Sequence, residues 1–246
     1  MKHILILGAT SAIATACARQ WAVDKSVFFL VGRDDVKLHA IAADLRVRGA
    51  NGVTTYLLDM NQFAQHAEML DVCAQQLPTI DIALVAHGTL PDQKACERDP
   101  AAALDAFTTN GLSVIVLLTL LANRMEAQRS GTIAVLCSVA ADRGRPSNYV
   151  YGSAKAAVST FCEGLCARLA KANVHMLTVK PGFVDTPMTQ GLNLPSLLLA
   201  TPENVARDIV RAVARRKNTL YTPWFWVFIM CIIRAIPTTI FKKLNL

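Results

Sequence analysis

The chain has 246 residues, of which 53% are hydrophobic and 17% are charged. This composition excludes a disordered chain, and the length suits a single α/β domain. Seven scattered cysteines, none spaced CxxC and without a histidine cluster, argue against a disulfide framework or a zinc site, so we expect reduced thiols and no metal. The first residues, MKHILILGAT, contain too short an apolar run for a signal peptide, so we expect a cytoplasmic protein.

The formal net charge of +7 is unevenly distributed. Residues 1–206 carry 17 basic and 17 acidic side chains, whereas residues 207–246 carry eight basic side chains and a single acid, Asp208. This asymmetry suggests that an anionic contact, with a membrane or a phosphate, has been added to a neutral domain. For residues 207–217 a solvated helix face is the alternative interpretation.

Short apolar runs alternate with helical patterns along the chain. We predict strands at residues 3–7, 27–31, 53–58, 80–86, 131–138 and 174–179, helices at 11–23, 36–48, 62–76, 101–128 and 151–172, and a further helix opened by Thr201-Pro202-Glu203. Apolar strands that alternate with helices are typical of a parallel sheet covered on both faces. The predicted fold is therefore α/β, a Rossmann-like doubly wound parallel sheet in a single domain over residues 1–220, followed by a hydrophobic and basic extension over residues 221–246.

The apolar segment Leu112–Ala122 lies within the longest predicted helix. At eleven residues it is too short to span a membrane, so we expect a core or interface helix.

The first predicted strand runs into a turn of small residues and then a helix. A glycine turn of this kind presents free backbone N–H groups to a phosphate. We therefore expect the turn to bind a dinucleotide through Gly8, Thr10, Ser11, Ala12 and Ile13. An ordinary strand-to-helix turn is the alternative, because the motif alone is weak.

A stronger signal combines Tyr151, Lys155 and Ser138. Tyr151 and Lys155 are four residues apart and share one face of a predicted helix. An ammonium group beside a phenol lowers the phenol pKa, so Tyr151 could transfer a proton near neutral pH. Ser138 ends the preceding strand, and its hydroxyl could hold the same substrate oxygen as Tyr151.

These residues, together with Asp59, Ala86-His87-Gly88, Asn110 and the segment from Pro181 to Thr186, resemble the short-chain dehydrogenases/reductases over nearly the whole chain. The resemblance implies that Asn110, Ser138, Tyr151 and Lys155 form a catalytic tetrad. Tyr151 would be the acid/base, Ser138 would orient the substrate oxygen, Lys155 would hold the nicotinamide ribose, and Asn110 would position a water. The remaining cofactor-binding residues implied are Asp59, Met60, Ala86, Gly88, Pro181, Gly182, Val184 and Thr186.

The sequence departs from the family pattern at two places. Ala12 and Ala14 replace two glycines of the usual turn, which puts cofactor affinity in doubt. Val85-Ala86-His87-Gly88 stands where the family has Asn-Asn-Ala-Gly, and His87 either contacts the cofactor or satisfies a local hydrogen bond.

Cofactor preference is expected to be decided after the second strand. An acid there binds the ribose 2′-hydroxyl of NAD, but this chain has Gly32 followed by Arg33, which can pair with a 2′-phosphate. NADP(H) is therefore favoured. NAD(H) is the alternative, since Asp34 or Asp35 could reach the ribose instead.

The segment between Ser138 and Tyr151 should border the substrate. Arg143 and Arg145 suit an anionic substrate, especially a phosphate, and Asn148 is a further substrate candidate. Salt bridges to Asp142 or to a neighbouring subunit are the alternative role for the two arginines.

The C-terminal extension is hydrophobic and basic. An uncharged run of ten residues from Trp224 to Ile233 is followed by Arg234, Lys242 and Lys243. Three interpretations compete: a segment in a membrane interface, the lining of a tunnel for a lipid substrate, or a contact in a homo-oligomer. We expect a dimer or tetramer, a peripheral contact with the inner face of the membrane, and no nucleic-acid partner.

The extension, Leu90-Pro91-Asp92 and the loop at residues 142–145 are similar to a narrower group, the decaprenylphosphoryl-2-keto-ribose reductases. This similarity implies reduction of a keto-sugar on a polyprenyl phosphate in cell-envelope synthesis. One alternative is a reductase of a soluble or acyl ketone, and another is a non-catalytic nicotinamide-binding protein at the membrane.

Overall fold

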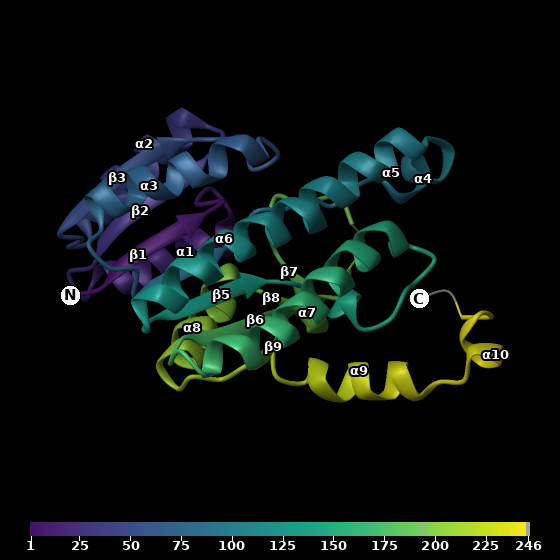
Figure 1. Cartoon of the computed structure of the whole chain (residues 1–246). Coiled ribbons are helices and arrows are strands. Elements are labelled where there is room, and N and C mark those ends of the chain that lie inside the picture. The colour runs from purple at the N-terminus through teal and green to yellow at the C-terminus, as the bar shows by residue number, and fades with distance from the viewer. Residues whose placement is uncertain (193, 245–246) are drawn as a thin grey trace.

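The computed structural model describes residues 1–192 and 194–244. Its centre is a seven-stranded parallel sheet with the strand order β3-β2-β1-β4-β5-β6-β9 (Figure 1). The strands are β1 (His3–Leu7), β2 (Val27–Gly32), β3 (Gly52–Leu57), β4 (Ile82–Val85), β5 (Thr132–Leu136), β6 (His175–Pro181) and β9 (Thr219–Thr222). The order reverses direction between β1 and β4, which confirms the predicted doubly wound fold.

Helices cover both faces of the sheet. One face packs against α1 (Ala12–Ala22), α2 (Asp35–Val47) and α8 (Pro202–Ala214), and the other against α3 (His66–Gln76), α6 (Ser113–Gln128) and α7 (Tyr149–Ala170). The central strands are almost fully buried because each presents apolar side chains to both helical layers. Two apolar cores, one on each face, therefore fix the carboxyl ends of the strands in place.

The long helix predicted over residues 101–128 is divided in the structure. It consists of α5 (Pro100–Phe107), a π-helical turn (Thr108–Leu112) and α6. Taken together, residues 100–128 are long and apolar enough to cross a membrane. Leu117, Leu118 and Leu121 are nevertheless fully buried against the sheet, so α6 is a core helix, as predicted for Leu112–Ala122.

A short helix and a pair of short strands were not predicted. The helix α4 (Gln93–Arg98) follows the loop after β4, and β7 (Phe183–Val184) pairs with β8 (Leu199–Ala200). Both lie in segments with too few residues to show a periodic pattern.

The seventh strand crosses the predicted domain boundary at residue 220. Tyr221 and Thr222 pair with Lys180 and Pro181 of β6, so they belong to the sheet. The extension proper starts after them and contains α9 (Trp226–Ala235) and α10 (Thr238–Phe241). Figure 1 shows both helices, in yellow, at the edge of the molecule. Residues 245 and 246 of the predicted extension lie outside the described residues.

Candidate active site

A cavity of about 530 Å³ opens at the carboxyl ends of β1, β4, β5 and β6. It is lined by every predicted catalytic and cofactor-binding residue, and by the predicted substrate residues Arg145 and Asn148. The lining set from the predictions is Gly8, Thr10, Ser11, Ala12, Ile13, Arg33, Asp59, Met60, Ala86, Gly88, Asn110, Ser138, Arg145, Asn148, Tyr151, Lys155, Pro181, Gly182, Val184 and Thr186. The topology therefore brings together residues that are far apart in the sequence.

The turn after β1 forms a cradle that requires glycine. Gly8 has a φ of +82°, and a Cβ added there would lie 2.5 Å from the backbone nitrogen of His87. The helix α1 begins directly after Ser11, whose side chain makes no capping bond, and its first turn carries no acid. The first N–H groups of α1 are thus available to an anion, which fits the pyrophosphate of a dinucleotide.

The two alanines that replace family glycines occupy different places. Ala12 lines the cavity, whereas Ala14 is fully buried in the apolar core and is absent from the cavity lining. Only one of the two extra methyl groups therefore faces a bound ligand.

The end of β2 leaves one cation available. Arg33 lines the cavity, is exposed, and makes no hydrogen bond or ion pair within residues 1–192 and 194–244. Asp34 instead caps α2. Its side chain accepts a hydrogen bond from the Lys37 backbone nitrogen at 3.0 Å and forms an ion pair with Lys37 Nζ at 3.1 Å. These bonds to Lys37 hold the pKa of Asp34 below its usual value. Asp35 pairs with His39 at 3.3 Å.

The loop after β4 is pinned by Asn110, which is fully buried in the π-helical turn. Its Oδ1 accepts a hydrogen bond from the Thr89 backbone nitrogen at 2.9 Å, and its Nδ2 donates to the Ala106 carbonyl at 2.9 Å. A Cβ added at Gly88 would lie 2.8 Å from Asn110 Oδ1 and 3.4 Å from Lys155 Nζ. Gly88, Asn110 and Lys155 therefore meet at the floor of the cavity.

His87, between Ala86 and Gly88, lines the same floor and also satisfies a local hydrogen bond. Its Nε2 lies 2.8 Å from the Ser113 hydroxyl, while Nδ1 is buried without a partner among the described residues. Burial, with the nearby Lys155 ammonium, lowers the pKa of His87 to about 3. The ring is therefore neutral at physiological pH.

The structure corrects the expected ionisation of Tyr151. Burial raises the pKa of Tyr151, and a hydrogen bond with Ser138 opposes this effect only in part. Lys155 Nζ lies 5.7 Å from the centre of the Tyr151 ring and donates to the Leu136 carbonyl at 3.1 Å. Burial also lowers the pKa of Lys155. In this cavity Tyr151 is thus a protonated acid at neutral pH, rather than a phenol poised to ionise.

Arg145 is nearly buried, and its Nε has no partner among the described residues. Burial lowers its pKa, and Asp142 offsets part of that effect. Asp142 itself accepts hydrogen bonds from Lys180 Nζ and Tyr221 Oη, both at 2.7 Å. Arg145 therefore contributes a cation to the cavity lining, and Asp142, the acid that offsets its desolvation, is already engaged.

The structure does not bring Arg143 into the cavity. Its Nη1 donates to the carbonyl oxygens of Ile233 and Ile236, both at 2.6 Å, and its guanidinium stacks 3.8 Å from the centre of the Phe241 ring. These partners are the free carbonyls at the end of α9, so Arg143 anchors the extension. Neither the expected substrate role nor a salt bridge to Asp142 describes this arrangement.

Sequence reasoning missed much of the apolar wall. Leu90, Phe183, Met188 and Leu192 line the cavity. Leu90 and Phe183 lie in segments that carry the family resemblance but were not assigned to the cavity wall, whereas Met188 and Leu192 lie in a loop without a motif. Trp226 of α9 lies behind this wall, since a Cβ added at Gly182 would lie 1.9 Å from the Trp226 Nε1. The available signal was that Met188 and Leu192 follow within six residues of Thr186, which was already predicted to bind the cofactor.

Comparison with known proteins identifies relatives. Residues 2–196 match the family described as short chain dehydrogenase. An uncharacterized oxidoreductase of Mycobacterium tuberculosis is 34% identical over 241 residues, covering 98% of this chain and 96% of the relative. An uncharacterized oxidoreductase of Streptomyces coelicolor is 30% identical over 244 residues, covering 99% and 96%. A solved structure described as a short chain dehydrogenase/reductase family protein superposes with a TM-score of 0.78 at 27% identity, covering 89% and 94%.

Proposed function

Because this chain belongs to the short chain dehydrogenase family, we propose that it reduces a ketone to an alcohol with NADPH. Its class, a nicotinamide-dependent oxidoreductase that interconverts an alcohol and a carbonyl, follows from the family. The observation that carries the proposal is the convergence of Ser138, Tyr151, Lys155 and a glycine cradle on one cavity. The preference for NADPH, the direction of reaction and the substrate class are the proposed parts.

The mechanism assigns a role to each polar group. A nicotinamide dinucleotide supplies the hydride when bound. Ser138 holds the carbonyl oxygen by a hydrogen bond, and Tyr151, a phenol whose pKa burial raises further above neutrality, donates its hydroxyl proton to that oxygen. Lys155 stabilises the resulting phenolate by its charge, and Asn110 fixes the loop beside it.

Arg33 supports NADPH as the reductant. It is the cavity-lining cation at the end of β2, and the two neighbouring acids are bound to Lys37 and His39. A guanidinium can pair with a 2′-phosphate through two hydrogen bonds, each worth about 1.5–3 kcal/mol when charged.

Replacing Arg33 tests this preference. For Arg33→Ala we expect the Kd of NADPH to rise about ten-fold to a hundred-fold, because one to two charged hydrogen bonds are lost. The Kd of NADH should not change, and Arg48→Ala, an exposed arginine outside the cavity, is the matched control. Equal binding of NADH and NADPH by the unaltered protein would contradict the preference.

We also propose an anionic, lipid-linked ketone as substrate, namely a keto-sugar on a polyprenyl phosphate, as the decaprenylphosphoryl-2-keto-ribose reductases use. Two features support this class. Arg145, whose side chain lines the cavity, offers its guanidinium charge to a phosphate, and Leu90, Met188 and Leu192 offer apolar surface to a prenyl chain. A soluble or acyl ketone is the competing substrate class, favoured by the same apolar wall.

The test is NADPH oxidation with a short-chain prenyl-phospho-2-keto-pentose and with the same keto-sugar lacking the prenyl phosphate. We expect turnover to require the prenyl phosphate, and Arg145→Gln to raise the KM about ten-fold or more by removing a charged hydrogen bond. Equal turnover of both compounds would indicate a general keto-sugar reductase. NADPH binding without turnover of either would discard the keto-sugar class and leave the cofactor assignment intact.

A further inference from the structure

The C-terminal extension contains an apolar helix, α9, of which only one side is buried against the rest of the protein. On the inner side of α9, Trp226 and Met230 are almost fully buried against Val139 and Phe183. On the outer side, Val227, Phe228 and Ile232 remain 45%, 62% and 66% exposed, and Trp224, just before the helix, is 71% exposed. Trp224, Phe228 and Ile232 are four residues apart and Val227 is three residues after Trp224, so the four side chains form one continuous stripe.

The stripe belongs to a firmly held segment. Trp224 contacts the rings of Phe225 and Phe228 edge-on, with ring centres 6.2 and 5.9 Å apart. At the other end of the helix, Arg143 binds the terminal carbonyls and stacks on Phe241. The exposed aromatic and aliphatic side chains therefore point outward from a segment that is held in place at both ends.

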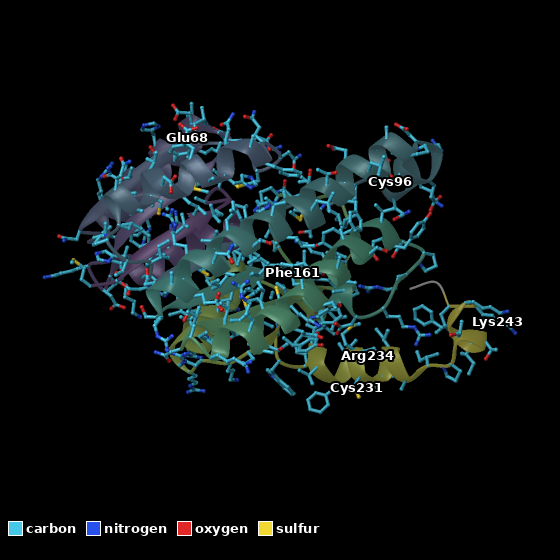
Figure 2. All side chains as sticks on the ribbon, in the orientation of Figure 1. Glu68, Cys96, Phe161, Cys231, Arg234 and Lys243 are labelled. Atoms are coloured by element: carbon cyan, nitrogen blue, oxygen red, sulfur yellow. The ribbon has the colours of Figure 1, made fainter. Side chains whose placement is uncertain are left out.

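The charged side chains of the extension itself all have the same sign. Arg234, Lys242 and Lys243 are exposed, and the sequence contains no acid after Asp208. Figure 2 shows Cys231 and Arg234 on α9 and Lys243 on α10, at the periphery of the molecule. An apolar stripe with aromatic side chains and flanking cations matches the apolar and anionic layers of a lipid surface.

From these observations we infer that α9 and α10 dock on the surface of a membrane that contains anionic lipids, with Trp224, Val227, Phe228 and Ile232 inserted. The ten residues of α9 are about 15 Å long, half of the roughly 30 Å of a bilayer core, so the helix lies in the interface and does not cross it. A second copy of the chain fits less well, because a symmetric contact over this face brings like charges together.

The docking would place the catalytic cavity beside the lipid. Phe183, Gly182 and Val139 line the cavity, and Trp226 packs directly behind them, with the Phe183 and Trp226 ring centres 5.1 Å apart. A substrate carried by lipid could then enter without leaving the membrane. The docking itself does not depend on the identity of the ketone.

Vesicle flotation of the full chain tests the inference, using neutral phosphatidylcholine vesicles and vesicles containing phosphatidylglycerol. We expect binding to the anionic vesicles, weakened by salt, with a blue shift of tryptophan fluorescence that is lost in Trp224→Phe. The double variant Phe228→Ser/Ile232→Ser should bind at least ten-fold more weakly. Lys242→Gln/Lys243→Gln should lose about five-fold for each charge removed.

The matched control is Val36→Ser/Val47→Ser, which removes two exposed apolar side chains from α2. Circular dichroism and NADPH binding show whether each variant is folded. Absence of binding to anionic vesicles, or equal binding by the control and the α9 variant, overturns the inference. So does a dimer, seen by light scattering without lipid, that Phe228→Ser/Ile232→Ser dissociates, because a second copy would then cover the stripe.

Discussion

At the scale of single residues, the pKa of Tyr151 differs from what its sequence neighbours predict, because the cavity raises it. Four-residue spacing places Lys155 on the same helical face, and a close ammonium would lower the phenol pKa. In the folded chain, however, burial dominates, and Lys155 is engaged with the Leu136 carbonyl. The spacing therefore predicted the pair correctly, but the ionisation of Tyr151 depends on solvent exclusion, which no sequence pattern encodes.

Tyr151→Phe should lower kcat for ketone reduction by at least about a hundred-fold, because the proton donor is lost. The Kd of NADPH should be unchanged. Tyr149→Phe is the control, since Tyr149 lies in the same helix, is exposed and does not line the cavity. Full turnover in Tyr151→Phe would remove the tyrosine from the mechanism.

The unaltered enzyme should also show a pH profile of defined sign. A protonated tyrosine is required for reduction, and its pKa is raised above the ordinary value of 10.0. The rate of reduction should therefore hold as pH rises through 9 and fall only above about 10. This is measured by single-turnover kinetics at saturating NADPH and ketone, and a fall near neutral pH would contradict the assignment.

At the scale of elements, the predictable parts are those with repeated patterns. The apolar runs of the sheet and the amphipathic helices were expected within a few residues of their ends. The π-helical turn around Asn110 was not, because a single turn of i→i+5 hydrogen bonds has no residue pattern of its own and lies inside one long apolar segment. The strand β9 was hidden for another reason, since its four residues lie at an edge and are only partly buried.

The role of Arg143 could not be read from the sequence either. Its neighbours Arg145 and Asn148 line the cavity, whereas its own side chain turns toward a segment about ninety residues away in the chain. Such long-range contacts follow from packing of the extension, which has no motif.

Arg143→Ala should release the extension. Arg143 Nη1 contacts the Arg234 carbonyl at 3.1 Å, which belongs to a peptide bond that trypsin can cleave. We expect cleavage after Arg234 to become at least ten times faster, because local opening of α9 no longer has to break these hydrogen bonds. Mass spectrometry measures the rate of this cleavage. Arg98→Ala, an exposed change on α4, is the control. Unchanged cleavage would show that Arg143 does not hold the helix.

At the scale of the whole molecule, buried histidines couple stability to pH. Burial lowers the pKa of His66, His87 and His175, for His87 from 6.5 to about 3. Below pH 6.5 the unfolded chain takes up protons on these histidines and the folded chain does not. Stability contributed by the neutral rings is therefore present above pH 6.5 and is lost as pH falls toward their folded pKa values.

Between pH 6.5 and 5 this loss should be visible apart from the carboxylates, because carboxylates of the unfolded chain protonate at about pH 4. The stability tied to the lowered pKa values of Asp34, Asp44, Glu97 and Glu126 is therefore lost only below about pH 5. Each depressed histidine contributes a slope of up to about 1.4 kcal/mol per pH unit. His87→Gln, which keeps a side chain able to bond Ser113, should reduce the slope by up to that amount in urea unfolding. Equal slopes for the unaltered protein and His87→Gln would mean that folding does not change the pKa of His87.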